Sequence, residues 1–98
     1  MSLSPSQRRY LRGRAHELDP VIRLGARGAT QSVLSELDTA LRRHELVKVK
    51  LSGDSRDERN TQMQALAGAT GAENVQQVGH MLLLFRRNEE APKLALPR

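Results

Sequence analysis

The chain has 98 residues, which is enough for one small domain with a single hydrophobic core and too few for two. It contains no cysteine, so a disulfide framework and a cysteine-based zinc site are both excluded. The formal net charge of +5 is concentrated in residues 1–28, where six arginines face two acidic residues; this favours a polyanionic partner, nucleic acid first, over a basic surface that only keeps the chain soluble.

The first predicted element is a helix that begins at Pro5. Ser4 suits the N-cap, Pro5 suits the first helical position, and Gln7 stands where a capping box needs it. The Asp19-Pro20 pair ends the helix, because proline disfavours helical backbone in the residue before it. One face carries the apolar stripe Leu11, Ala15 and Leu18. Much of the remaining circumference carries Arg8, Arg9, Arg12 and Arg14.

A short, apolar and β-branched strand is predicted from Val21 to Leu24, and the loop Gly25 to Gly28 follows it. A second helix opens at Thr30 or its neighbour and closes at His44 and Glu45. Its apolar face repeats at helical spacing through Val33, Leu34, Leu37, Ala40 and Leu41.

The segment LVKVKL, Leu46 to Leu51, alternates strictly between apolar and basic residues. This pattern predicts a strand with one buried face and one wet face, and Lys48 and Lys50 share the wet face. After a turn at residues 52–54, Ser55 to Glu58 matches a capping box and opens a third helix. The apolar stripe of this helix is Met63, Leu66, Ala67 and Thr70.

The C-terminal part of the chain predicts a β-hairpin, because Val75 to Val78 and Met81 to Arg86 flank the two-residue turn Gly79-His80. The tail from Asn88 has two prolines and mixed charges, so we expect a domain over residues 1–87 and a loosely ordered tail over 88–98. The whole order predicts an α/β fold, a single compact domain arranged α-β-α-β-α-β-β with a mixed four-stranded sheet. The hairpin must be antiparallel, and the two helical crossovers make parallel pairings possible.

Two Gly-x-x-Gly stretches differ in where they fall. Gly25 to Gly28 leaves a strand and enters a helix, where glycine lets a ligand approach and the helix N-terminus offers free amides and partial positive charge to a phosphate. Arg27 adds a full charge with forked donors; the alternative for this loop is a tight structural turn. Gly68 to Gly71 falls at a helix end with only the acidic Glu73 beside it, so we interpret it as a helix cap.

Four segments, taken in order, resemble the YhbY type of CRM-domain protein: LSPSQRRYLRGRAHELDPVIRLGARGAT, LDTALRRHELVKVKL, TGAENVQQVGHMLLLFRR and LALPR. The resemblance covers about Leu3 to Arg98. It implies a fold similar to the C-terminal domain of bacterial translation initiation factor three, RNA binding, and, for stand-alone bacterial members, association with precursors of the large ribosomal subunit. It assigns the family's loop to Gly25, Ala26, Arg27 and Gly28. The family's turn before the last strand often has lysine after glycine, where this chain has His80.

Other residues give no sign of catalysis or of a metal site. The three histidines, at 16, 44 and 80, are too scattered to form a metal set, and no serine or carboxylate pair suits nucleophilic or acid–base chemistry. We therefore expect neither an enzyme nor a cofactor. Tyr10 and Phe85 are the only aromatic residues, too few for a base-stacking platform. Recognition should then depend on phosphates, sugar hydroxyls and shape, which favours folded RNA.

These observations predict a non-enzymatic RNA-binding monomer that acts on structured ribosomal RNA in large-subunit assembly. The polar N-terminus and the short longest apolar run, Met81 to Phe85, predict a cytoplasmic protein without a membrane segment. One alternative is a protein-interaction module that docks its basic first helix on an acidic partner or ribosomal protein; a DNA-binding protein lacks an obvious recognition helix. The predicted RNA-binding residues are Gly25, Ala26, Arg27, Gly28, Arg8, Arg9, Arg12, Arg23, Lys48, Lys50, His80 and Arg86. We expect a phosphate at the Gly25 to Gly28 loop and the next helix start, with charge around it from Arg8, Arg9, Arg12, Arg23 and Arg27. For Lys48, Lys50 and Arg86 the alternative is a solvated strand position, and for His80 it is a plain turn residue.

Overall fold

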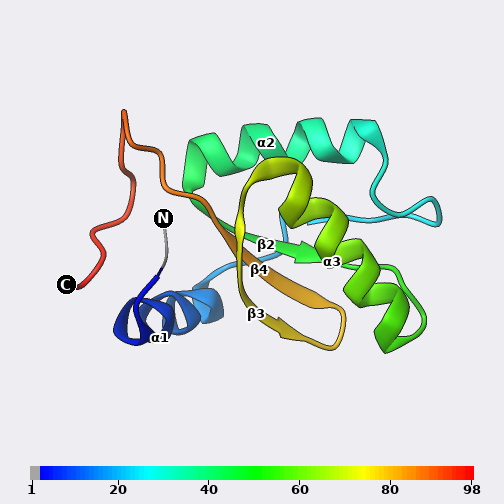
Figure 1. Cartoon of the computed structure of the whole chain (residues 1–98), viewed down its shortest axis with the longest axis horizontal. Coiled ribbons are helices and arrows are strands. Elements are labelled where there is room, and N and C mark those ends of the chain that lie inside the picture. The colour runs from blue at the N-terminus through cyan, green and yellow to red at the C-terminus, as the bar shows by residue number, and fades with distance from the viewer. Residues whose placement is uncertain (1–2) are drawn as a thin grey trace.

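In a computed structural model, which describes residues 3–98, the elements follow the predicted order (Figure 1). The helices of this region are α1 (Pro5–Arg14), α2 (Gln31–His44) and α3 (Arg56–Thr70), and a short 3-10 segment, η1 (Ala15–Glu17), continues α1. The strands are β1 (Ile22–Arg23), β2 (Leu46–Lys50), β3 (Glu73–Val78) and β4 (Met81–Phe85).

The strands form one mixed sheet in the order β1-β2-β4-β3. β1 and β2 pair in parallel through the α2 crossover, whereas β4 pairs antiparallel with both β2 and β3. The α3 crossover therefore carries the chain past one strand position, which β4 then fills. The predicted α/β fold with a mixed four-stranded sheet and an antiparallel hairpin is confirmed.

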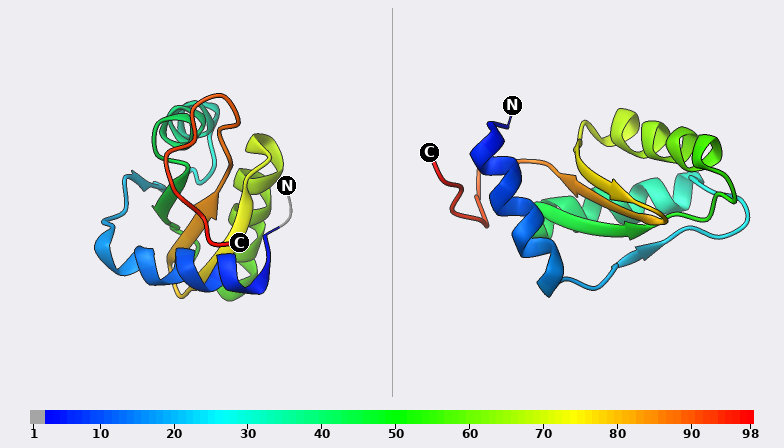
Figure 2. Two further views of the ribbon diagram at one scale, coloured as in Figure 1. Left: turned by 90° about the vertical axis from the view of Figure 1, so that its left-hand side faces the viewer. Right: turned by 90° about the horizontal axis from the view of Figure 1, so that it is seen from below.

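The helices α2 and α3 cover one face of the sheet (Figure 2). Their apolar stripes meet every second side chain of the strands, as the alternation in LVKVKL predicts for Val47, Val49 and Leu51. Leu residues dominate this core. Those with no exposed surface are Leu37, Leu41, Leu66, Leu82 and Leu84.

The helix α1 lies on the opposite face and covers one end of the sheet (Figures 1 and 2). Leu11 and Ala15, two members of the predicted stripe, belong with Leu83 and Phe85 of β4 to a second buried cluster. The rest of this face has no helix over it. Strand partners in one row share a face, and the row that pairs Arg23, Lys50, Met81 and Val78 is largely exposed.

Local sequence signals set the ends of the helices. The predicted capping box at α1 is confirmed, because the Gln7 amide donates to Ser4 Oγ at 3.2 Å and the Ser4 amide donates to Gln7 Oε1 at 2.9 Å. Thr30 and Ser55 cap α2 and α3 with one bond each, by accepting the backbone amides of Val33 at 3.2 Å and Glu58 at 3.0 Å. The capping box predicted at Ser55 is therefore only half formed, because Glu58 Oε2 accepts the Asp54 amide at 2.9 Å instead of the Ser55 amide. At the other end of α3, Gly71 has the left-handed conformation expected of a C-cap, with φ of 72°.

All four strands differ in their bounds from the prediction. β2 and β4 each end one residue earlier than expected, at Lys50 and Phe85, and β1 and β3 differ more. β1 keeps only Ile22 and Arg23, because the chain turns into the glycine loop beyond it, although the Leu24 amide still donates to Lys50 O at 2.9 Å. β3 begins at Glu73 instead of Val75, and its register with β4 shifts between Asn74 and Gln76. This irregularity falls in the polar part of β3, the edge strand, where the sequence has no alternation of apolar and polar residues that would predict a strand.

The tail over residues 88–98 forms no helix or strand, yet a buried carboxylate holds its first part. Glu45, the C-cap of α2, has φ of 64° and no exposed surface. Its carboxylate accepts the amides of Asn88 at 2.7 Å, Lys93 at 2.7 Å and Leu94 at 2.9 Å. Burial raises the pKa of Glu45, but these amide donors and the Arg87 guanidinium outweigh it and lower the pKa below its ordinary value. The tail has more defined contacts than its composition suggests.

Candidate nucleic-acid interface

The loop Gly25 to Gly28 lies at one end of the long axis of the molecule, where β1 leaves the sheet (Figure 1). The Gly28 amide donates to Gly25 O at 3.0 Å, which closes the loop into a turn. The Ser52 hydroxyl donates to the same carbonyl at 2.7 Å and ties the turn to the segment after β2. The loop is therefore braced against its neighbours.

The two glycines of this loop have different reasons to be glycine. Gly28 has φ of +69°, and a Cβ there would lie 3.2 Å from Gln62 Nε2 on α3. Gly25 has no such φ, and a Cβ would meet nothing within 4 Å. The fold therefore requires Gly28, whereas a side chain at Gly25 would obstruct only a molecule that approaches from outside.

The first turn of α2 supplies unpaired amides beside the loop. Thr30 Oγ1 accepts the Val33 amide at 3.2 Å, which leaves the amides of Gln31 and Ser32 as donors with no partner in the helix. No acidic residue occupies this turn. The helix start therefore combines free donors with the positive end of the helix dipole, the arrangement that binds phosphate.

Predicted basic residues gather around this end of the sheet. Arg27 is exposed in the loop itself, and Arg23 and Lys50 are exposed strand partners on the face without a helix. His80 lies in the β3–β4 turn, where its Nδ1 is 2.9 Å from Leu51 O and so donates to that carbonyl. This leaves Nε2 facing away from the bond.

Two residues near the loop make its surroundings less positive than the sequence suggests. Lys48, one row further along β2, is half-buried and donates to Leu18 O at 3.1 Å. Glu58 of α3 lines a shallow hollow of about 390 Å³ together with Ala26 and Arg27. This carboxylate makes the α3 side of the loop less favourable for an anion than the α2 side.

The arginines of α1 do not surround the loop, contrary to the expectation from the sequence. α1 packs through Leu11 and Ala15 over the other end of the sheet (Figure 2). Arg8 points to β3, where it forms an ion pair with Glu73 at 3.0 Å and donates to Asn74 O at 3.1 Å. Arg9 is exposed and Arg12 half-buried. Any RNA contact by these arginines would belong to a separate region of the surface.

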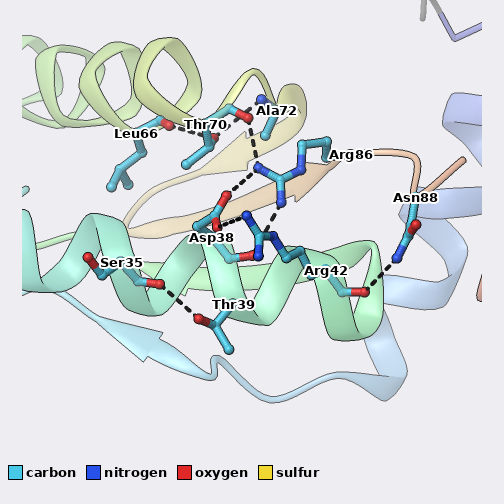
Figure 3. Close-up of polar contacts among 9 residues, drawn as sticks. All are labelled: Ser35, Asp38, Thr39, Arg42, Leu66, Thr70, Ala72, Arg86 and Asn88. Atoms are coloured by element: carbon cyan, nitrogen blue, oxygen red, sulfur yellow. Dashed lines mark hydrogen bonds and ion pairs between the residues drawn. The ribbon is translucent and has the colours of Figure 1, made fainter. Parts of the chain in front are cut away.

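Arg86 is occupied within the protein (Figure 3). Its guanidinium donates to Asp38 Oδ1 at 2.8 Å and to Thr70 O at 2.9 Å, and so joins β4 to α2 and to the end of α3. Hydrogen bonding from Arg86 is the largest influence on the Asp38 carboxyl and lowers its pKa. A phosphate that contacted Arg86 would have to compete with Asp38 and with the Thr70 carbonyl for its guanidinium.

Sequence reasoning missed the polar brace behind the loop. Gln62 Oε1 accepts the amides of Ser52 at 3.1 Å and Gly53 at 3.0 Å, and Gln62 Nε2 donates to Ser52 Oγ at 2.9 Å. Ser52 in turn holds Gly25, as described above. Gln62 is one of several polar residues on α3, and nothing in its sequence context separates it from the others.

Within residues 3–98, no cluster of three or more histidine, aspartate or glutamate side chains forms a possible metal site. The same region contains no helix long and apolar enough to cross a bilayer.

Comparison with known proteins places this geometry in a family. The model of the CRS1/YhbY (CRM) domain matches residues 3–86. An RNA-binding protein of Haemophilus influenzae is 45% identical over 99% of this chain and 97% of its own length, and a probable RNA-binding protein of Pseudomonas aeruginosa is 37% identical over 95% and 89%.

Among solved structures, the solution structure of a hypothetical Staphylococcus aureus protein, described as a candidate RNA-binding protein, matches with a TM-score of 0.83. The two chains are 32% identical, and the match covers 98% of this chain and all of that one. The agreement therefore extends over sequence and fold together. The chain belongs to the CRS1/YhbY (CRM) domain family.

Proposed function

We propose that this protein binds structured RNA without catalysing a reaction, and that the Gly25 to Gly28 loop and the start of α2 hold an RNA phosphate. The observation that carries the proposal is the open space at Gly25, beside two helix-start amides and no acidic residue in that turn. Glycine costs conformational entropy, so its use where neither φ nor packing requires it favours a role in ligand approach.

The charges around the loop suit a polyanion. Arg27, Arg23 and Lys50 are exposed on the same end of the molecule, and within residues 3–98 none of them enters an ion pair, so each can neutralise a phosphate. Since the chain has no aromatic platform, phosphate and sugar contacts must supply most of the affinity. The binding is therefore expected to fall steeply with salt.

Ribosomal RNA in precursors of the large subunit is the proposed target, and a cytoplasmic monomer is the proposed form. Support comes from the relatives described as RNA-binding and from the resemblance of the whole chain to stand-alone YhbY-type proteins.

Sedimentation of a tagged protein from cell lysate tests this function. We expect co-migration with large-subunit precursors at low salt, and loss of co-migration after RNase treatment or at moderate salt. A protein that stays at the top of the gradient even at low salt would contradict the ribosomal part of the proposal. Competition between structured RNA and duplex DNA at equal salt then tests the choice of nucleic acid.

A second candidate function follows from the separation of α1 from the loop. Arg9 and Arg12 lie on a helix at the other end of the sheet, where they could dock an acidic partner or a ribosomal protein. This function predicts capture of a partner that survives nuclease and is lost in an Arg9→Glu, Arg12→Glu double variant.

A further inference from the structure

A second hollow lies at the end of the sheet opposite the loop, and its floor is apolar. It measures about 380 Å³ and opens between the end of η1, the start of β2 and the tail. Leu18, Val21 and Leu94 contribute apolar surface, and Val21 is 55% exposed. This volume lies in the range of small-molecule sites, which combine apolar walls with a few polar groups.

The rim of this hollow is mostly basic. Four cationic side chains line it against two carboxylates, those of Glu17 and Asp19. Glu17 is paired with Arg14 at 3.2 Å, whereas within residues 3–98 Arg43, Lys93 and Asp19 enter no ion pair. Arg43 and Lys93 can therefore meet an anion, and Asp19 can accept a hydrogen bond from it.

The buried Glu45 carboxylate fixes the wall of the hollow that the tail forms. Lys93 and Leu94 line the hollow, and their backbone amides donate to the Glu45 carboxylate at 2.7 and 2.9 Å. Leu94 also packs against the second buried cluster, which contains Leu11 and Phe85 and which we call the α1 cluster. The side of the hollow that the tail forms is therefore fixed, although the tail forms no helix or strand.

The basic face of the sheet joins this hollow to the loop. β1 and β2 run in parallel from the hollow toward the loop. Lys48 lines the hollow itself, and Lys50 and Arg23 follow it toward the loop on the face that α1 leaves open. Five residues of strand span roughly 16 Å. One RNA strand that follows these cations would reach both ends.

We propose that this hollow receives one unpaired nucleotide of the bound RNA, with its base against Leu18, Val21 and Leu94 and its phosphate beside Arg43 and Lys93. The proposal rests on the proposed function. Tyr10 is half-buried and Phe85 is buried in the α1 cluster, so a cavity must do what exposed aromatic rings do elsewhere. Asp19 accepts a hydrogen bond from an exocyclic amino group of the base, which favours cytosine, adenine and guanine over uracil, since only uracil has no such group.

The test is a titration of the isotope-labelled full chain with cytidine 5′-monophosphate, uridine 5′-monophosphate and inorganic phosphate, followed by amide chemical shifts. We expect both nucleotides to shift the amides of Leu18, Lys48 and Leu94 saturably, with cytidine bound about three- to ten-fold more tightly than uridine. Asp19→Ala should abolish that difference. Inorganic phosphate should shift residues 25–32, and should shift the amides of the hollow much less than either nucleotide does, because it has no base to occupy the apolar floor.

A matched pair of variants locates the site. Val21 and Val78 are the exposed large apolar residues of the described chain, at 55% and 63%, and only Val21 lines the hollow. Val21→Glu should weaken the binding of cytidine 5′-monophosphate at least about ten-fold, because the substitution removes apolar surface and the new carboxylate repels the phosphate. Val78→Glu should leave the affinity for this nucleotide unchanged.

Three results overturn the proposal: no shifts at the hollow, equal effects of the two variants, or shifts there with an acidic peptide in place of either nucleotide. The last result would make the hollow a protein-docking site. Failure of this inference alone would leave binding of an RNA hairpin intact, whereas failure of the proposed function would abolish hairpin binding altogether.

Discussion

Two stretches of this chain share the spacing Gly-x-x-Gly and the left-handed backbone of the second glycine, with φ of 69° at Gly28 and 72° at Gly71. They differ in the helix end beside them. Gly28 precedes the start of α2, where amides and partial positive charge are available, and Gly71 follows the last turn of α3, where carbonyls and partial negative charge are available. The helix end, and not the glycine spacing, decides whether an anion is attracted.

The strongest test of this comparison places the same charge in both stretches. Ala26 and Ala69 each follow the first glycine, and both are exposed. Ala26→Glu should lower the affinity for a structured RNA about ten-fold or more, because the new carboxylate repels phosphate. Ala69→Glu should leave the affinity unchanged. Equal losses in a filter-binding or anisotropy assay would remove the distinction between the stretches.

Substitution of the second glycine should cost more stability in the first stretch than in the other. Gly28→Ala and Gly71→Ala each force a left-handed alanine, at a cost of about 1–2 kcal/mol in the free energy of unfolding. Gly28→Ala should cost more, because its Cβ would also displace Gln62 and disturb the Ser52 brace, whereas the space at Gly71 is open. Chemical denaturation measures both values. A larger cost at Gly71 would contradict the packing described for the loop.

Removing the Arg27 cation should change the salt dependence of RNA binding more clearly than the affinity itself. Arg27→Ala should weaken RNA binding several-fold and reduce the slope of log affinity against log salt by about 0.7–0.9, the value of one phosphate contact. The matched control is Arg98→Ala, which removes an exposed cation of the tail. An unchanged slope for Arg27→Ala would show that this guanidinium contacts no phosphate.

The smallest structural effect is expected at Gly25. Gly25→Ala should leave the free energy of unfolding within about 0.5 kcal/mol of the original, because the new methyl group meets no atom of the chain. RNA affinity should nevertheless fall a few-fold if the ligand approaches the backbone there. Normal affinity in this variant would reduce Gly25 to an ordinary turn residue.

Local features of the fold follow directly from the sequence. Ser4, Thr30 and Ser55 cap their helices, and Gly71 ends α3, because capping depends on neighbours within a few residues. The insertion of β4 between β2 and β3 has no such local signal, since hydrophobic alternation does not identify a strand's partner.

The candidate site divides in the same way. The loop and the start of α2 are contiguous in sequence, so their geometry was predictable. The pairing of Arg8 with Glu73 and of Arg86 with Asp38 joins residues far apart in the chain. These long-range pairs explain why net charge alone overestimates the number of arginines available to RNA.

Titration of the protein with a short RNA hairpin, followed by amide chemical shifts, tests both glycine stretches in a single sample. Isotope-labelled protein mixed with a short RNA hairpin should show amide shift changes at Gly25 to Ser32 that fade as salt rises, and no comparable changes at Gly68 to Gly71. Changes confined to Gly68–Gly71, or absent from residues 25–32 while the hairpin binds elsewhere, would contradict the assignment of the RNA phosphate to the first stretch.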